Sequence, residues 1–386
     1  MTEWKEYKFS DFVDINPLVR IPKNIPISFV EMKDLDPSMR YCESSQLKLL
    51  SGGSRFINGD TLFARITPCL ENGKICQVRY LQNNIGFGST EFHVFRAKNG
   101  ISDTNFVYYL SRWNEVREHA ELNLEGSSGR QRVSKEAFDN LYLLLPPLPE
   151  QIRIASILSS LDDKIDLLHR ENKTLEAMAE TLFKELVVNE NNDGTLENII
   201  SIQNGYAFKS KDFKEAGEHQ IIKIKNISSG IIDIDSTDCV DSDVIVDVST
   251  KFKVNSGDVL IAMTGAEIGK LGVIPKNDKS LWLNQRVGLL VEKYKGAKYL
   301  AYLQLKSEYG QDYIENTATG SAQPNISGTG IEQCGFPILD EEIIIQISKQ
   351  IGEFYDKIIL NLGQINKVKE IRDCLLNKLF IKQTVS

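Results

Sequence analysis

Polar and basic residues that can contact nucleic acid recur in loops of both halves of the sequence. Arginine, asparagine and glutamine can form paired hydrogen bonds with guanine and adenine edges, whereas lysine mainly contacts phosphates. In the first half these residues are Arg55, Arg65, Asn72, Lys74, Arg130, Gln131 and Arg132. In the second half they are Lys209, Lys211, Lys223, Lys225, Asn226, Lys270, Asn284, Gln285, Arg286, Gln323 and Asn325. Each alone is typical of an ordinary surface, but their occurrence in corresponding loops favours contact with DNA.

Motifs for catalysis are lacking in the sequence. The segment GAEIGK (265–270) resembles a phosphate-binding loop, but it is one residue short and has Leu271 where a hydroxyl would bind Mg²⁺. We interpret it as a turn between strands. There is no GxSxG, HExxH or NPPY-like motif, and no GxGxxG after a strand. Asp162 and Asp163 are adjacent on a predicted helix and point to different faces, which indicates a solvated surface and not a carboxylate pair.

The composition sets further limits on function. Six cysteines without a CxxC pair and four scattered histidines disfavour a structural metal site or a disulfide framework. No apolar run approaches the roughly 20 residues of a membrane span, and the polar N-terminus lacks a signal-peptide core, so we expect a soluble cytoplasmic protein. The 53 acidic residues outnumber the 45 basic ones. That balance weakens nucleic-acid binding as a hypothesis but leaves room for a local basic groove.

An internal repeat divides the 386 residues into two similar halves. FINGDTLFARI (56–66) recurs as VNSGDVLIAMT (254–264), and SSGRQRVS (127–134) corresponds to GSAQPNIS (320–327). Each half then passes through a proline-containing strand end into a long helical pattern. The order along the chain is therefore globular domain, helix, globular domain, helix.

Both predicted helices carry the heptad spacing of a coiled coil. The apolar stripe of the first consists of Ile154, Leu158, Leu161, Ile165, Leu168, Asn172, Leu175, Ala179, Leu182 and Leu186. Adding 193 to each number gives the stripe of the second: Ile347, Ile351, Phe354, Ile358, Asn361, Ile365, Val368, Arg372, Leu375 and Leu379. Two unrelated helices, each packed on its own domain, would not match at ten positions.

Chain direction predicts how these helices pair. Because only the short polar link 189–194 follows the first helix, the second domain must begin at its C-terminal end, and the second helix must return antiparallel. The stripe from Ile154 to Leu186 spans about 48 Å at 1.5 Å per residue. We therefore predict two similar domains, 1–146 and 190–338, related by a pseudo-twofold axis and separated by helices 147–189 and 339–386.

Full overlap of the helices predicts their register, because facing residues then have numbers that sum to 533. Asn172 would face Asn361, Leu175 would face Ile358, and Ala179 would face Phe354. Since a buried amide without a partner costs about 1–3 kcal/mol, pairing of the two asparagines would penalise slippage and fix the length of the spacer. Arg372 would face Leu161, and we expect its stem to follow the stripe while its head reaches water.

The globular parts predict an α+β fold with twisted antiparallel sheets. Short alternating strands are separated by Gly, Pro and Asn turns and joined by modest helices such as NFVYYLSRW (105–113). The expected strands are TLFARI (61–66), KICQV (74–78) and EFHVFR (91–96), then IIKIKNI (221–227), DVLIAM (258–263), LGVIP (271–275) and VGLLVEK (287–293).

The junctions between domains and helices carry a recognisable signature. The first reads PPLPEQ (146–151), then Ile154-Ala155, Leu158 and LDDKI (161–165), and the second ends in YDKI (355–358). NGYAFKSKDF (204–213) is similar to the opening of a target recognition domain. With these motifs the whole chain resembles the specificity subunit of type I restriction-modification systems. The segment PILDEE (337–342) departs from the family pattern at the second proline and at the Glu-Gln pair.

The resemblance implies a DNA reader without catalytic, metal or cofactor sites of its own. Each target recognition domain would read one half of an asymmetric bipartite sequence in double-stranded DNA, and the helices would act as a ruler. The helices would also dock two methyltransferase subunits that carry S-adenosylmethionine and methylate adenine. Separate restriction subunits would use ATP and Mg²⁺. The residues alone leave an alternative open, a bipartite coiled-coil adaptor that binds proteins and not DNA.

Overall fold

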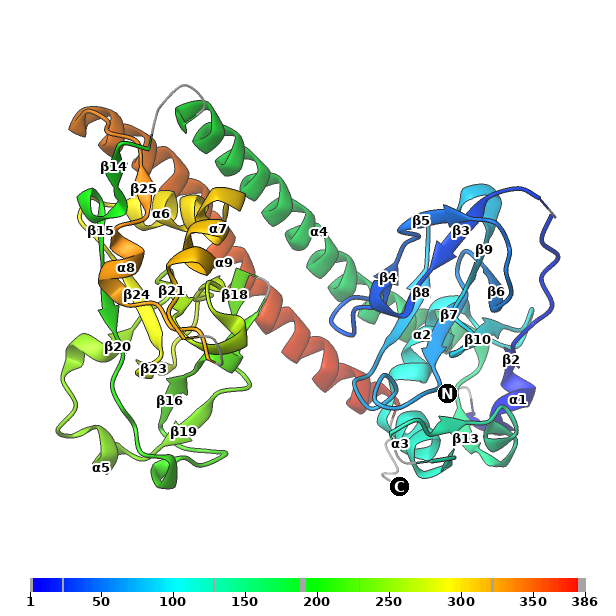
Figure 1. The fold of residues 1–386 in the computed structure, drawn as a ribbon. Helices are drawn as coiled ribbons and strands as arrows, with labels where there is room; N and C mark the ends of the chain where they lie inside the picture. The colour runs from blue at the N-terminus through cyan, green and yellow to red at the C-terminus, as the bar shows by residue number, and fades with distance from the viewer. Residues whose placement is uncertain are drawn as a thin grey trace. The chain divides into compact units, whose positions relative to one another are not determined.

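The computed structural model describes residues 3–22, 24–127, 129–187, 192–228, 230–320 and 323–380. It divides into two compact units, one made of Met1–Leu167 with Lys367–Ser386 and the other of Leu168–Asn366. Each unit contains one set of sheets and a part of both long helices (Figure 1). Of the predicted segments, positions 188 and 189 of the first helix, 189–191 of the link and 381–386 of the second helix lie outside the described residues.

The first unit contains two sheets, with strand orders β2-β10-β7-β8-β4 and β5-β3-β9-β6. The larger consists of β2 (Val13–Ile15), β4 (Tyr41–Cys42), β7 (Thr61–Ala64), β8 (Ile75–Val78) and β10 (Phe92–Ala97). The other consists of β3 (Ile27–Val30), β5 (Gln46–Lys48), β6 (Ser54–Ile57) and β9 (Ile85–Gly88). Two short ladders join β1 (Lys5–Lys8) to β13 (Tyr142–Leu145) and β11 (Leu124–Glu125) to β12 (Arg132–Val133). The short helices are α1 (Phe9–Phe12), α2 (Thr104–Arg112) and α3 (Asn114–Leu122).

The second unit repeats this plan with strand orders β15-β24-β21-β22-β18-β17 and β19-β16-β23-β20. The larger sheet consists of β15 (Ile200–Asn204), β17 (Ile227–Ser228), β18 (Gly230–Ile232), β21 (Val259–Ala262), β22 (Leu271–Val273) and β24 (Val287–Glu292). The other consists of β16 (His219–Ile222), β19 (Asp238–Val240), β20 (Lys253–Val254) and β23 (Ser280–Leu283). A ladder joins β14 (Gly194–Thr195) to β25 (Gly335–Phe336). The short helices are α5 (Ser242–Ile245), α6 (Ala297–Lys306), α7 (Glu308–Thr317) and α8 (Gly328–Glu332).

The two domains share the central antiparallel pairing that the repeat predicts. Ala64 of β7 lies opposite Phe92 of β10, and Ala262 of β21 lies opposite Val287 of β24. Most strand pairs are antiparallel, and parallel pairs also occur at β3–β9 and β4–β8 and at β16–β23 and β18–β22. The α+β fold with two similar domains is confirmed.

The cores of the two domains differ in side-chain type although their sheets match. In the first domain, three phenylalanines of the matched strands are buried: Phe56, Phe63 and Phe92. The corresponding positions of the second domain hold buried aliphatic side chains: Val254, Ile261 and Val287. Similar backbones with different packing therefore hold the loops of the two domains.

The long helices are α4 (Leu148–Val187) and α9 (Glu341–Phe380), with 40 residues each. All twenty residues of the predicted stripes are buried or half-buried, which confirms the coiled-coil seam. Gln151 ties the start of α4 to the domain: its amide accepts from the Asp103 N–H and donates to the carbonyls of Ile101 and Pro146, each at 2.9 Å. No helix in the described part of the chain is long and apolar enough to cross a membrane.

The two seam asparagines are in contact in the second unit. Asn361 is fully buried, and its Nδ2 donates to Oδ1 of Asn172 at 2.8 Å and to Oε2 of Glu171 at 3.0 Å. The pairing of these two amides is the one that the register predicts. The facing of Leu175 with Ile358 and of Ala179 with Phe354 stays a prediction.

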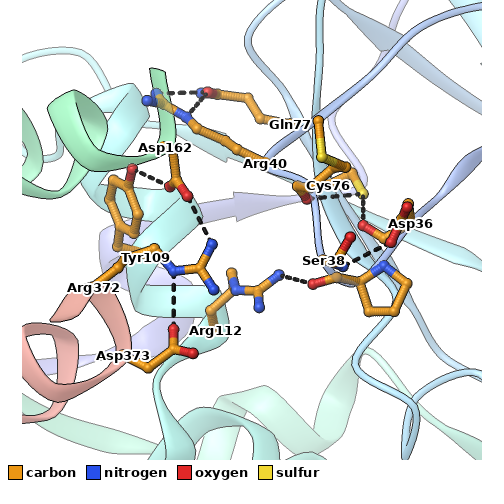
Figure 2. Close-up of polar contacts among 12 residues, drawn as sticks. Asp36, Ser38, Arg40, Cys76, Gln77, Tyr109, Arg112, Asp162, Arg372 and Asp373 are labelled. Carbon is orange, nitrogen blue, oxygen red and sulfur yellow. Dashed lines mark hydrogen bonds and ion pairs between the residues drawn. The ribbon is translucent and has the colours of Figure 1, made fainter. Parts of the chain in front are cut away.

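A buried ion pair in the first unit corrects two expectations (Figure 2). Asp162 is 3% exposed, and its carboxylate accepts from Nη1 of Arg372 at 2.7 Å and from the Tyr109 hydroxyl at 2.6 Å. Arg372 is 4% exposed, so its head does not reach water. Although burial opposes the charge, Asp162 and Asp373 raise the pKa of Arg372 above its ordinary value. Asp162 is not part of a solvated surface, because α2 covers it; Asp163 is exposed.

Replacing Arg372 by methionine would leave the buried Asp162 carboxylate without its ion-pair partner. We expect the free energy of unfolding to fall by about 3–5 kcal/mol, measured by urea denaturation. The control is Arg153→Met, which removes the exposed ion pair with Glu150 and should cost less than about 1 kcal/mol. Equal losses for the two variants would contradict a structural role for the buried pair.

Candidate nucleic-acid interface

Three loops meet at one end of the larger sheet in the first domain. The Arg65 N–H, just after β7, donates to the carbonyl of Glu91, just before β10, at 3.0 Å. The Val133 N–H donates to the Arg65 carbonyl at 2.9 Å, and the Thr67 N–H to the Gln131 carbonyl at 3.0 Å. We call this meeting point, residues 65–67, 91 and 131–133, the loop junction of the first domain.

The second domain builds its loop junction, residues 263–265, 286 and 324–326, with the same backbone bonds. Met263 N–H donates to the Arg286 carbonyl at 3.1 Å, and Ile326 N–H donates to the Met263 carbonyl at 3.0 Å. Gly265 N–H donates to the Pro324 carbonyl at 2.8 Å. Position 91 therefore corresponds to 286, and position 132 corresponds to 325.

A polar groove of about 460 Å³ lies at the second junction. Its lining consists of Asn204, Met263, Thr264, Gln285, Arg286, Gln323, Asn325, Ile326 and Ser327. Four of these residues were predicted from the sequence: Gln285, Arg286, Gln323 and Asn325. All four are exposed, and among the described residues the guanidinium of Arg286 has no hydrogen-bond or ion-pair partner. The groove thus presents donors and acceptors of the kind that contact base edges.

The first junction is occupied by an ion pair. Arg132 donates from Nε to Glu91 Oε2 at 2.9 Å and from Nη2 to Glu91 Oε1 at 2.7 Å. Hydrogen bonding from Arg132 lowers the pKa of Glu91 below its usual value. Gln131 is half-buried beside the pair, and Arg130 is exposed. The half-buried Arg65 has an Nε without a hydrogen-bond partner.

A second groove in the first domain, of about 530 Å³, contains one predicted residue, Arg55. Asn16, Pro17, Leu18, Val19, Gly53, Ser54, Arg55, Thr90 and Val94 line it. Thr90 precedes Glu91 as Gln285 precedes Arg286, so this groove borders the junction at an equivalent position.

Two predicted residues are engaged inside their domains. Asn226 is fully buried: its Nδ2 donates to the carbonyl and hydroxyl of Ser236, both at 3.1 Å, and its Oδ1 accepts from the Lys223 N–H at 2.8 Å. The expectation that Asn226 contacts DNA is therefore corrected. The expected strand 221–227 ends at Ile222, and a 3₁₀ turn follows that turns this amide inward. Lys74 is half-buried and donates to the Met32 carbonyl at 2.8 Å.

Other predicted lysines have acidic partners on the surface. Lys223 and Lys225 both contact Asp238, at 2.8 and 3.0 Å, and Lys270 pairs with Glu267 in the turn between β21 and β22. Asn284 is half-buried at the end of β23, where its N–H donates to the Ile222 carbonyl at 3.1 Å. The predicted residues with exposed side chains and no ion pair within the described ranges are Arg55, Asn72, Arg130, Lys209, Lys211, Gln285, Arg286, Gln323 and Asn325.

Glu91 is the main junction residue that sequence reasoning missed. The repeat contained a signal for it, because GFGSTEF (86–92) and LWLNQRV (281–287) occupy the same place between matched strands. The predicted set included Asn284, Gln285 and Arg286 of the second half. It did not include Thr90 and Glu91, the first-half residues that correspond to Gln285 and Arg286.

A buried histidine contacts the first junction from the interior of the domain. His93 is fully buried, its Nε2 lies 3.0 Å from the Val133 carbonyl, and its Nδ1 lies 3.2 Å from Nδ2 of Asn16. Burial lowers the pKa of His93 from 6.5 to about 4. The imidazole is therefore neutral at pH 7, with Nε2–H as the donor to Val133.

The depressed pKa predicts acid sensitivity of the free energy of unfolding. Between pH 6.5 and about 4 the unfolded chain protonates His93 while the folded chain does not, so stability present above pH 6.5 is lost as the pH falls. The loss due to this residue should be about 3 kcal/mol. His93→Gln, which cannot titrate, separates this effect from that of the carboxylates in urea denaturation between pH 7 and 4. Parallel pH profiles of the two proteins would contradict the assignment.

Comparison with known proteins identifies the family. A sequence-family model described as "Type I restriction modification DNA specificity domain" matches residues 1–177 and again 189–370. The EcoAI specificity subunit of Escherichia coli is 30% identical over 204 residues, which cover 50% of this chain and 35% of that protein. The alignments with two E. coli relatives thus span about a third of their length. The HindI specificity subunit of Haemophilus influenzae is 22% identical over 463 residues, covering 98% of this chain and 99% of the relative.

A solved structure supports the fold. The S subunit of a type I restriction-modification system from M. genitalium superposes with a TM-score of 0.54 at 16% identity, over 99% of this chain and 97% of that one. Because the family model matches both halves, the chain belongs to the type I restriction modification DNA specificity domain family.

Proposed function

We propose that this chain is the non-catalytic DNA-recognition subunit of a type I restriction-modification complex. The observation that carries the proposal is one backbone scaffold, built twice, with different polar side chains at corresponding positions. Two unlike readers suit the two halves of an asymmetric bipartite site. The target recognition domains would comprise residues 1–146 and 190–338, and the complex would act on double-stranded DNA in the cytoplasm.

The second junction supports base reading most directly. Arg286 has a guanidinium without a partner among the described residues, and Gln285, Gln323 and Asn325 lie around the same groove. Arginine binds guanine O6 and N7 with two parallel bonds, and asparagine or glutamine binds adenine N6 and N7 in the same manner. Exposed lysines elsewhere, such as Lys209 and Lys211, would contact phosphates.

We propose that the seam fixes the distance between the two readers. A slip of one heptad would separate Asn172 from Asn361 and leave both amides without their present hydrogen bond. The helices 147–189 and 339–386 would then act as a ruler for the unread DNA between the half-sites. At about 48 Å, the seam exceeds the roughly 34–36 Å between half-sites that lie one helical turn apart.

We further propose that the helices dock two methyltransferase subunits. Three large apolar residues on α4 are exposed, and the residues 193 positions later on α9 are also large, apolar and exposed. The pairs are Ile152 and Ile345, Leu167 and Leu360, and Met178 and Ile371, all between 43% and 50% exposed. The same surface presented twice suits two copies of one partner. S-adenosylmethionine, ATP and Mg²⁺ would be bound by the partner subunits.

Charged replacements on this surface test the docking. Leu167→Asp together with Leu360→Asp should weaken assembly with the methyltransferase subunit by about tenfold or more, because each would bury a carboxylate in an apolar contact. Sedimentation of mixtures measures the assembly. Lys173→Asp, at an exposed polar position on another face of α4, should leave assembly unchanged. Equal behaviour of the double variant and this control would contradict docking at these residues.

Methylome sequencing of a host with and without the gene tests the DNA-reading function. We expect loss of one adenine-methylation motif made of two short parts with an unread spacer. Complementation with Arg286→Ala should restore methylation with relaxed sequence in one half only, because a lost bidentate contact costs about 1–3 kcal/mol. An unchanged methylome, together with DNA binding that is insensitive to salt, would favour the protein adaptor.

A further inference from the structure

The two loop junctions differ in which of their loops carries the arginine. In the first domain, position 91 is a glutamate and position 132 an arginine; in the second, the corresponding residues are Arg286 and Asn325. Each junction therefore contains one arginine at these two positions, on opposite loops. Since the backbone bonds are the same, the exchange moves the charged group without moving the scaffold.

Arg132 uses some of its N–H donors for contacts within the protein and leaves others without a protein partner. Nε and Nη2 bind the two oxygens of Glu91, and Nη1 donates to the Arg130 carbonyl at 3.1 Å. A guanidinium has five N–H groups, and these contacts use three of them. One N–H remains on each terminal nitrogen. Two such donors are what a bidentate contact with guanine O6 and N7 requires.

The ion pair with Glu91 matters more for the orientation of the Arg132 side chain than for the stability of the fold. The side chains of Arg132 and Glu91 are 42% and 24% exposed, and ion pairs this accessible contribute little to stability. Holding the fork in one orientation, however, removes rotamer freedom before DNA arrives, so less is lost on binding. Arg286, which has no such partner among the described residues, lacks this restraint.

We propose that Arg132 and Arg286 each read a guanine in their own half-site, from opposite loops, and that Glu91 is a positioning residue for Arg132. This inference rests on the proposed DNA-reading function. It assigns sequence specificity to two pairs of corresponding positions, 91 with 286 and 132 with 325. The residues at 91 and 132 would determine the base read in the first half-site, and those at 286 and 325 the base read in the second.

The test uses the full-length chain and DNA duplexes that carry the methylome-derived motif, with each base pair changed in turn. Arg132→Ala should lower discrimination at one guanine of the first half-site by about tenfold or more, and Glu91→Gln should lower it severalfold at the same base. Discrimination in the second half-site should stay as in the wild type. The control is Glu125→Gln, which removes an exposed carboxylate opposite Arg132 in the β11–β12 ladder and should change neither half-site.

The double variant Glu91→Arg with Arg132→Asn places the second domain's pair on the first scaffold. We expect it to move the base preference within the first half-site and not to abolish it. Thermal unfolding of every variant shows whether the fold is retained, and only folded variants are compared. A merely structural ion pair would change the melting temperature without changing base preference.

Two negative results are distinguishable. If the wild-type chain binds all duplexes alike, the proposed DNA-reading function fails. If the wild type discriminates but Arg132→Ala and Glu91→Gln keep its base preference, or change both half-sites equally, the positioning of Arg132 by Glu91 is overturned while the proposed function stands.

Discussion

Polar groups buried in the helix seam constrain which helices can pair. The Asp162 carboxylate pairs with Arg372, and the side-chain amide of Asn172 accepts a hydrogen bond from that of Asn361. In both cases the partner comes from the other half of the repeat. Two copies of α4 paired in the same register would instead place Asp162 opposite Ala179, a residue without a counter-charge. A buried carboxylate without a partner is strongly destabilising. The seam therefore selects the pairing of α4 with α9 over the pairing of like helices.

The same region connects the seam to the domains. In the first unit the Tyr109 hydroxyl of α2 donates to Asp162, and Phe106 of α2 stacks on Phe380 of α9 at 4.9 Å. In the second unit the stacked rings of Tyr299 and Tyr355, 4.5 Å apart, join α6 to α9. Position 355 corresponds to 162, so ring packing replaces the ion pair. Different side-chain contacts at equivalent positions thus attach each domain to the long helices.

The sequence predicted the features that rest on periodicity and repetition. The seam, the two similar domains and the contact of Asn172 with Asn361 follow from spacing along the chain, and the structure contains all of them. The burial of Asp162 was missed because the tyrosine that covers it lies 53 residues earlier. Asn226 was misread because the alternating run IIKIKNI (221–227) did not reveal where the strand gives way to a turn. Glu91 pairs with a residue 41 positions away, which no local pattern records.

Selection of bound DNA from a random library measures the central claim, that one chain reads two half-sites at a distance held by its helices. The complex of this chain with its methyltransferase subunits should enrich duplexes with two short, unlike sequence blocks at one constant separation. A single contiguous block, blocks at variable separations, or the absence of enrichment would contradict this account.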